Sequence, residues 1–224
     1  MDLKMKNSDQ QIIKFNYENN FKNEDFYISK SNKRILQLLN SWPNWEKNFL
    51  NISGENFSGK THLINIFLKK FKGIKFEADS LNDSHLKEIK LHQNIVLENI
   101  KNNVDEKLIY TLLNMIEQDN KFLIITSIKP LVNIDFKLID LKSRTKSFLL
   151  QNIENPDDEL IYALIIKNLS DRQISIEKKL IDYIIKRIER SYSKIFYFIY
   201  KIDELSLKKK KSIDLKIIKE VLGD

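Results

Sequence analysis

The chain has 224 residues, a formal net charge of +7 and no cysteine. This length is sufficient for one sizeable core, or for a main domain with a smaller satellite. The lack of cysteine excludes disulfides and thiolate metal sites and agrees with a reducing cytoplasm. No apolar run approaches the roughly 20 residues that a membrane helix needs, and residues 1–15 lack the apolar run of a secretion signal. We therefore expect a cytoplasmic protein without membrane contact.

Up to residue 150, apolar residues follow helical and strand-like spacing in turn. Helices are expected at 31–39, 61–71, 80–90 and 108–117, and strands at 49–52, 74–78, 94–97, 122–126 and 148–150. Pro43, between Trp42 and Trp45, ends the first helix. Strands that alternate with helices favour an α/β domain with a mostly parallel sheet.

After Pro156 the apolar pattern is helical only. Asp157, Asp158 and Glu159 provide the acidic start that favours a helix N-terminus. Further helical stretches run over 176–188, 192–205 and 214–222. These stretches predict a four-helix satellite, with a domain boundary near residues 152–156.

Between a strand and a helix, one segment matches the phosphate-binding pattern GxxxxGK[ST]. It consists of Gly54, Glu55, Asn56, Phe57, Ser58, Gly59, Lys60 and Thr61, and is followed by His62. Two of the four glycines in the chain occupy the glycine positions of the motif. In such a P-loop the backbone N–H groups surround phosphate oxygens, the lysine reaches the β- and γ-phosphates, and the hydroxyl binds Mg²⁺. The sequence therefore predicts a nucleotide site, with Lys60 on phosphate and Thr61 on the metal.

The strand at 94–97 leads into Glu98 and Asn99. A P-loop enzyme needs an acid at the end of a neighbouring strand to hold hydrated Mg²⁺, and Glu98 fits this role. Its alternative role is that of an exposed charge at a strand end. The next position, where many ATPases place the carboxylate that activates water, is Asn99, and an amide cannot act as a general base. We expect the chain to bind ADP or ATP and to hydrolyse it weakly or not at all by itself.

Several segments in order resemble the DnaA/Hda branch of the AAA+ ATPases, over residues 10–222. They are residues 42–45, 58–63, 97–100, 113–114, 125–127 and 140–144. The resemblance implies a parallel five-stranded sheet in the order 5-1-4-3-2 and a C-terminal all-helical lid. The expected domains are thus an AAA+ domain over 21–153 and a lid over 154–224. The resemblance also adds His62 and Ser127 to the nucleotide-binding residues.

Residues 140–144, Asp-Leu-Lys-Ser-Arg, are similar to the DLxSR box of this branch. The resemblance implies that Arg144 is an arginine finger, which reaches the γ-phosphate bound by a neighbouring subunit. Guanidinium suits this role because it is always charged and presents a fork of donors. A surface or structural arginine is the alternative. The neighbour would be DnaA, or a second copy in a homo-oligomer.

Two positions depart from the family pattern. The sensor 2 arginine of the lid aligns with Ser193. Arg190 and Lys194, one turn or less away, are the candidates to substitute for it, and Arg190 is therefore added to the nucleotide-binding residues. Ile128 stands where DnaA carries aspartate after Thr-Ser. Both changes weaken the expectation of autonomous hydrolysis. Because the sequence ends after the lid, without a DNA-reading helix-turn-helix domain, we expect an Hda-like chain rather than an initiator.

Near the N-terminus, residues 10–15 fit the pattern Q-x-x-[apolar]-x-[aromatic], which resembles the bacterial sliding-clamp-binding peptide. Gln10 would anchor the peptide by hydrogen bonds, while Ile13 and Phe15 would fill an apolar pocket. Residues 1–20 would then form a clamp-binding arm. Alternatively, these apolar residues pack as a strand or arm on the main domain.

The resemblance thus implies a regulator of replication initiation. With the DNA-loaded sliding clamp, it would stimulate the hydrolysis of DnaA-bound ATP through Arg144. Its contact with DNA would be mainly indirect, because the lysines are spread along the chain. Two alternatives are a self-contained AAA+ ATPase that acts as a helicase loader, and an adaptor that binds single-stranded DNA through its lysine excess.

Overall fold

The computed structural model describes residues 26–223. Its elements are α1 (Lys30–Asn40), β1 (Phe49–Ser53), α2 (Lys60–Phe71), β2 (Ile74–Glu77), α3 (Asp83–Ile89), β3 (Asn94–Ile100), α4 (Glu106–Gln118), β4 (Phe122–Ser127), η2 (Leu131–Asn133), α5 (Ile139–Arg144), η3 (Thr145–Ser147), β5 (Leu149–Asn152), α6 (Asp158–Ser170), α7 (Lys178–Ile185), α8 (Tyr192–Lys209) and α9 (Leu215–Leu222). The predicted clamp-binding residues Gln10, Ile13 and Phe15 lie outside the described range. Within that range, no helix has the length and apolarity to span a bilayer.

The five strands form one parallel sheet in the order β2-β3-β4-β1-β5. Read from the other edge, this is the predicted order 5-1-4-3-2, which is therefore confirmed. Strand β3 is longer than predicted because it continues past Glu98 to Ile100. Strand β5 begins and ends slightly later than predicted. Parallel strands bring their carboxyl ends to one edge of the sheet, where the P-loop follows β1.

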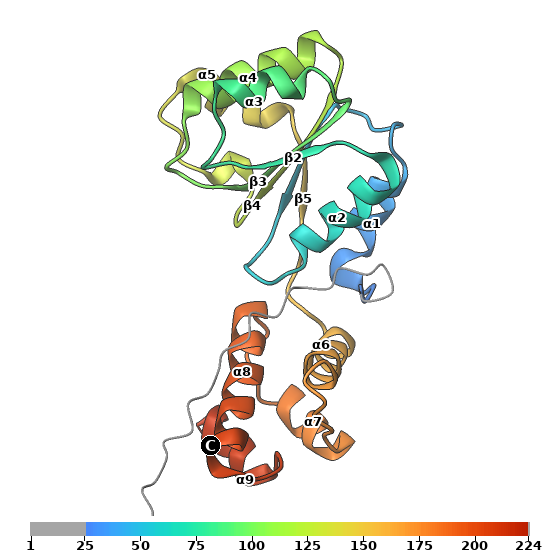
Figure 1. The fold of residues 1–224 in the computed structure, drawn as a ribbon, viewed down its shortest axis with the longest axis vertical. Helices are drawn as coiled ribbons and strands as arrows, with labels where there is room; N and C mark the ends of the chain where they lie inside the picture. The colour runs from blue at the N-terminus through green and yellow to red at the C-terminus, as the bar shows by residue number, and fades with distance from the viewer. Residues whose placement is uncertain (1–25, 224) are drawn as a thin grey trace, which may run out of the picture.

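Helices cover both faces of the sheet (Figure 1). Successive side chains of a strand point to opposite faces, so Ile95 and Leu97 of β3 pack beneath α3, α4 and α5. Val96, between them, packs with Leu63 and Phe67 of α2 and with α1. The two faces of the sheet therefore carry different functional segments. The face with α2 includes the P-loop helix, and the opposite face carries the arginine box.

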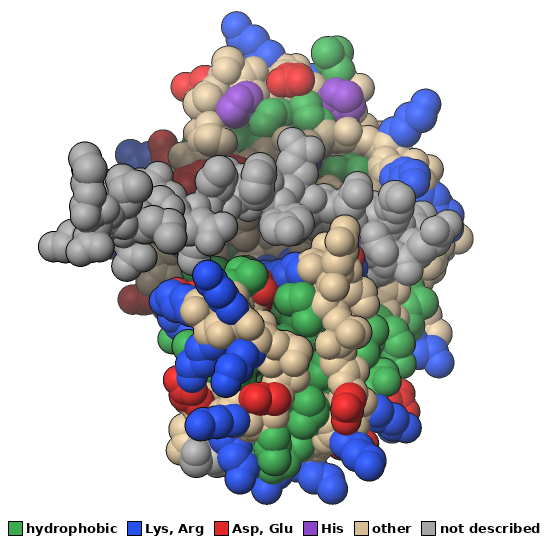
Figure 2. All heavy atoms as spheres, turned by 60° about the horizontal axis from the view of Figure 1, so that its bottom comes forward, with side chains coloured by type: hydrophobic (Ala, Val, Ile, Leu, Met, Phe, Trp, Pro, Cys, Tyr) green, Lys and Arg blue, Asp and Glu red, His purple; other side chains and the backbone are tan. Residues whose placement is uncertain are grey.

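Helices α6 to α9 form the four-helix unit predicted after Pro156 and surround their own apolar core. Side-chain caps begin three of these helices: Asp157 accepts from Leu160 N, Ser191 from Lys194 N, and Asp214 from Ile217 N. On the face shown in Figure 2, lysine and arginine side chains of this unit are interspersed with acidic ones. This agrees with the expectation that the basic excess does not gather in one patch.

The sequence did not predict α5 as a helix. It has six residues, so it is too short to show a helical period. Its first residue, Ile139, is 80% exposed, while Leu141 is buried. One buried apolar position in a single short element gives no detectable amphipathic pattern.

Asn51 is a buried polar side chain in the middle of β1. Its amide nitrogen donates to Ile125 O at 3.0 Å and to Ser127 Oγ at 2.9 Å, and its oxygen accepts from Leu131 N at 3.0 Å. We expect Asn51→Ala to lower the free energy of unfolding by about 2 kcal/mol, because it leaves the buried N–H of Leu131 unpaired. Urea unfolding measures this loss.

The control is Asn48→Ala, which removes an exposed amide bonded to Asn120. It is expected to change the free energy of unfolding by less than about 0.5 kcal/mol. Equal losses in the two variants would contradict the role assigned to the Asn51 network.

Candidate nucleotide site

The P-loop leaves β1 at Gly54, whose N–H donates to Ser127 O at 3.1 Å. A Cβ at Gly54 would lie 2.8 Å from Ser58 Oγ and 3.1 Å from Ile153 Cβ, so the close approach requires glycine. Gly59 has a φ of +94° and begins α2, a conformation that glycine adopts without strain. Local backbone geometry therefore explains why glycine occupies both of these positions in the motif. The first turn of α2 follows the loop directly, and the N-terminus of a helix suits an anion.

Lys60 is buried at the first position of α2. Its Nζ donates to Gly54 O at 2.7 Å and to Glu55 O at 2.9 Å, so the side chain folds back over the loop. Burial lowers the pKa of Lys60, while the Glu98 and Glu55 carboxylates act in the opposite direction. An anion in the loop would offset the cost of keeping this charge buried.

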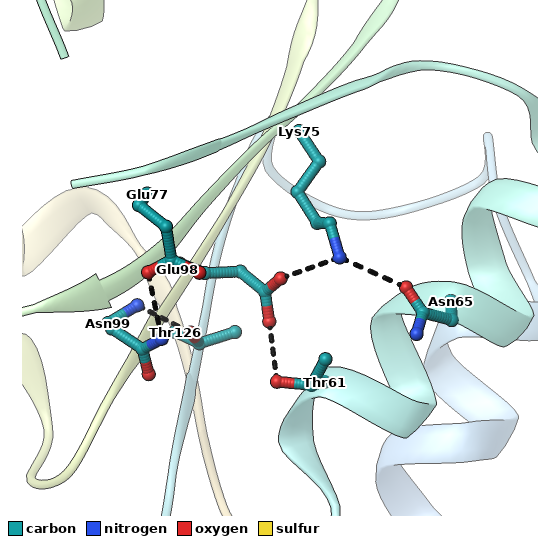
Figure 3. Close-up of polar contacts among 7 residues, drawn as sticks. All are labelled: Thr61, Asn65, Lys75, Glu77, Glu98, Asn99 and Thr126. Carbon is teal, nitrogen blue, oxygen red and sulfur yellow. Dashed lines mark hydrogen bonds and ion pairs between the residues drawn. The ribbon is translucent and has the colours of Figure 1, made fainter. Parts of the chain in front are cut away.

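Thr61 and Glu98 meet across the space between α2 and β3 (Figure 3). Thr61 Oγ1 donates to Glu98 Oε1 at 2.8 Å, and Glu98 Oε2 lies 3.0 Å from Lys75 Nζ on β2. Lys75 also donates to Asn65 Oδ1 at 3.2 Å. A hydroxyl oxygen and a carboxylate oxygen side by side are the kind of oxygen ligands that Mg²⁺ prefers. The two residues therefore fit the metal that the P-loop implies.

Asn99 lies beside Glu98, in a bulge where the register between β3 and β4 shifts. Its φ is +61°, which asparagine tolerates better than most residues. Its N–H donates to Thr126 Oγ1 at 2.9 Å, and its amide Nδ2 donates to Glu77 Oε2 at 2.9 Å. The bulge thus brings both Glu98 and Asn99 to the P-loop edge, and β2 supplies a partner for each.

Ser127, predicted as a nucleotide-binding residue, has its side chain bonded to Asn51. Its strand neighbours on the same face, Leu123 and Ile125, pack beneath α4. Thr126 lies on the α2 face instead, next to Asn99 (Figure 3). The side chain of Thr126 therefore lies on the α2 face, while Ser127 contacts the P-loop through its carbonyl oxygen, which accepts from Gly54 N. Strand alternation, counted from the apolar residues of β4, is the signal that would have identified Thr126.

Glu55 joins the P-loop to the lid. Its Oε1 accepts from Ser191 Oγ at 2.6 Å and from Ser193 N at 3.2 Å, and its Oε2 accepts from Tyr192 N at 2.8 Å. Burial acts to raise the pKa of Glu55, but the hydrogen bonds from Ser191, Ser193 and Tyr192 outweigh it, so the pKa is lowered. The carboxylate therefore caps the N-terminus of α8, where a negative charge is favourable.

Phe57 makes a second contact between the P-loop and the lid. Its ring stacks on Phe196 of α8, with centroids 4.8 Å apart and an interplanar angle of 20°. Phe57 is 61% exposed and has a φ of +66°, while Asn56 before it is exposed. Two residues predicted to surround phosphate, Glu55 and Phe57, thus contact the lid.

The cations near the sensor 2 position pair within the lid. Arg190 Nη2 lies 2.6 Å from Asp158 Oδ1 at the start of α6, and Lys194 Nζ lies 3.8 Å from Glu189 Oε2. Ser193, which aligns with the sensor 2 arginine, donates its N–H to Glu55. A contact between the Glu55 carboxylate and the start of α8 thus connects the lid and the P-loop.

Phe26 is a residue of the site that the sequence analysis did not identify. Its ring packs edge-on against His62, with centroids 5.1 Å apart, and a Cβ at Gly59 would lie 3.3 Å from it. Phe26 therefore adjoins the beginning of α2, together with the predicted residue His62. Its isolated position before α1 gave no pattern from which to predict this.

Arg144 lies at the end of α5, on the sheet face opposite α2. Its Nη1 donates to Glu117 Oε2 at 2.5 Å and its Nη2 to Asn114 Oδ1 at 2.7 Å, both on α4. The side chain is 29% exposed. The sheet separates Arg144 from the P-loop of its own chain, and its guanidinium retains further donors for another partner.

Comparison with known proteins agrees with this geometry. The sequence is 23% identical to the chromosomal replication initiator protein DnaA of Caldanaerobacter subterraneus subsp. tengcongensis, over 99% of this chain and 56% of that one. Domain III of Thermotoga maritima DnaA superposes with a TM-score of 0.73 at 17% identity, covering 92% of this chain and 97% of the other. AMPPCP-bound DnaA from Aquifex aeolicus gives a TM-score of 0.62 at 21% identity, covering 84% and 68%. Residues 157–222 match the family model for the Hda lid domain.

Together these matches support an Hda-like AAA+ protein of the DnaA branch. The match to the Hda lid covers all of α6 to α9, together with Asp157, the N-cap of α6. This Hda-like chain spans about half the length of the DnaA relative it matches, 56%. The solved structures share its fold, and the assignment to the Hda-like group depends on the lid.

The contact between Glu55 and α8 gives a testable property of this Hda-like protein. Glu55→Ala is expected to lower the free energy of unfolding by about 1 kcal/mol, as for loss of a helix cap, and to speed amide exchange at Tyr192 and Ser193. Because the pKa of Glu55 is lowered from 4.5 on folding, the contact stabilises the protein above that pH. This stability is lost as the pH falls through the folded-state pKa.

Hydrogen exchange followed by mass spectrometry, with urea unfolding, measures both effects. The control is Glu46→Ala, which removes an exposed carboxylate before β1. Unchanged exchange at the start of α8 in Glu55→Ala would show that the carboxylate does not hold the lid.

Proposed function

We propose that this protein binds ADP or ATP with Mg²⁺ and regulates replication initiation. With the DNA-loaded sliding clamp, it stimulates the hydrolysis of DnaA-bound ATP by presenting Arg144 to the partner's nucleotide. One observation carries the proposal: the arginine of the DLxSR box lies on the sheet face opposite its own P-loop helix. An arginine in that position suits a phosphate on a neighbouring molecule.

The nucleotide site supports the first part of the proposal. Lys60 and the N–H groups at the start of α2 would hold the phosphates, and His62 and Phe26 lie beside them. Thr61 and Glu98 would hold Mg²⁺, which supplies positive charge to the phosphate oxygens when bound. The AMPPCP-bound DnaA of Aquifex aeolicus has the same fold.

The residues around the nucleotide site favour weak hydrolysis by the chain itself, which fits a regulatory role. Asn99, next to Glu98, cannot accept a proton from water. Arg190 and Lys194 are paired with carboxylates of the lid. The chain would therefore keep its own nucleotide as a structural ligand, and catalysis would take place on ATP bound to DnaA.

The test measures hydrolysis of DnaA-bound ATP with this protein and DNA-loaded clamp, added together and separately. Stimulation only with both present supports the clamp contact through Gln10, Ile13 and Phe15, as well as the finger. The variant Gln10→Ala should then lose the clamp-dependent stimulation and keep nucleotide binding. If nucleotide binds and no stimulation occurs, the regulatory proposal fails while the nucleotide site remains.

A self-contained ATPase, acting as a helicase loader, is the second candidate. It is favoured by Glu77, a carboxylate beside Asn99 that can accept a proton. DNA-stimulated ATP hydrolysis by the chain alone, abolished in Glu77→Gln, would support this candidate. If the chain alone hydrolyses no ATP, either with or without DNA, this candidate is excluded.

A further inference from the structure

Both carboxylate oxygens of Glu98 are already engaged by side chains of this chain. Thr61 Oγ1 donates to one at 2.8 Å, and Lys75 Nζ lies 3.0 Å from the other (Figure 3). The Glu98 side chain is 2% exposed, whereas Lys75 is 35% exposed. The ion pair therefore has a buried acid and a partly exposed cation.

Two features hold Lys75 in this position. It lies on β2, in register with Val96 of β3, so its side chain extends over the same face as Glu98. Its ammonium also donates to Asn65 on α2, at 3.2 Å. Lys75 thus bridges the P-loop helix and the strand that carries the acid.

The Lys75 ammonium contacts the Glu98 carboxylate, which is the group that would bind a metal ion. A cation within 3.0 Å neutralises most of the charge of Glu98 and competes with Mg²⁺ for its oxygens. Without a cation, the buried carboxylate would repel a phosphate bound in the loop. With Lys75 in place this repulsion is reduced whether or not metal is present.

We propose that Lys75 is the resident cation of the nucleotide site, so that a nucleoside diphosphate binds with little dependence on Mg²⁺. The inference rests on the proposed nucleotide binding. It specifies the ligand class, since a diphosphate does not need the metal that bridges β- and γ-phosphates. It also agrees with a site that keeps its nucleotide rather than hydrolysing it.

The test compares ADP affinity in Mg²⁺ and in EDTA by isothermal titration calorimetry. For the unaltered protein, the two dissociation constants should agree within about threefold. Lys75→Met should bind ADP about tenfold more weakly in EDTA, because it leaves a buried carboxylate unpaired, and Mg²⁺ should restore most of the affinity. Lys75→Arg, which keeps the charge, should resemble the unaltered protein.

Lys87→Met is the matched control, since it removes one exposed lysine charge from α3. It should bind ADP like the unaltered protein in both buffers. Thermal unfolding of each variant checks folding. If Lys75→Met does not fold, the unaltered protein and Lys75→Arg still provide the comparison.

The outcomes separate this inference from the proposed function. A loss of ADP affinity of about tenfold or more in EDTA for the unaltered protein overturns the role of Lys75. Equal affinity of Lys75→Met and the unaltered protein in EDTA does the same. A protein that binds ADP in neither buffer would instead remove the proposed nucleotide site, and this inference with it.

Discussion

Arg144→Ala is expected to lower the clamp-dependent hydrolysis of DnaA-bound ATP by about a thousandfold, the scale of an arginine finger supplied in trans. ADP binding by the variant should remain within about twofold of the unaltered protein, because the sheet lies between Arg144 and the P-loop. A single-turnover assay with ATP-loaded DnaA measures the first effect, and calorimetry measures the second.

Two controls separate the finger from the local structure around α5. Glu117→Gln weakens the ion pair that holds Arg144 on α4 and keeps the guanidinium. It should leave stimulation intact or raise it, since the arginine is then freer to reach a partner. Lys142→Ala removes an exposed charge from the same helix and should have a small effect. Normal stimulation by Arg144→Ala would refute the finger, whereas equal losses in Glu117→Gln would indicate a structural role.

The main features of the sheet domain could be predicted from sequence because its central strands β1, β3 and β4 are buried on both faces. Near-continuous apolar runs such as 122–126 are typical of central parallel strands, and the helices between them show a clear apolar face. The structure has these elements within a few residues of prediction. The alternation of strands and helices therefore predicted a parallel α/β sheet, and the family resemblance supplied its strand order.

The P-loop contacts could be predicted for a different reason. Gly54, Gly59 and Lys60 are adjacent in sequence, so local backbone geometry determines where they lie. The partner of Thr61 was also predictable, because the carboxyl ends of parallel strands meet at one edge of the sheet and Glu98 lies near that end of β3. The structure brings these two side chains within 2.8 Å of each other.

Contacts between residues far apart in the chain could not be predicted. Glu55 bonds to α8 more than 130 residues later, and Lys75 reaches Glu98 because β2 pairs with β3. The bulge at Asn99 requires knowledge of the register with β4. Each depends on tertiary geometry, for which a single sequence gives no signal. These contacts are the ones that distinguish this site from a generic P-loop.

Lys60→Ala is expected to weaken ADP binding by about a hundredfold, the scale of removing one partner from a buried charged contact. The Lys60 ammonium is buried against Gly54 O and Glu55 O. A phosphate bound in the loop would therefore interact at short range with a positive charge that is shielded from water. Burial also lowers the pKa of Lys60. An anionic ligand would stabilise the charged form of Lys60, and the Lys60→Ala variant lacks this attraction between the ammonium and the ligand.

Calorimetry measures the affinity, and thermal unfolding provides an independent reading. ADP at a hundred times its dissociation constant should stabilise the unaltered protein by about 2.7 kcal/mol and the variant by well under about 1 kcal/mol. The control is Lys69→Ala, which removes an exposed lysine from the other end of α2. If Lys60→Ala binds ADP as tightly as this control, the nucleotide does not lie in the P-loop.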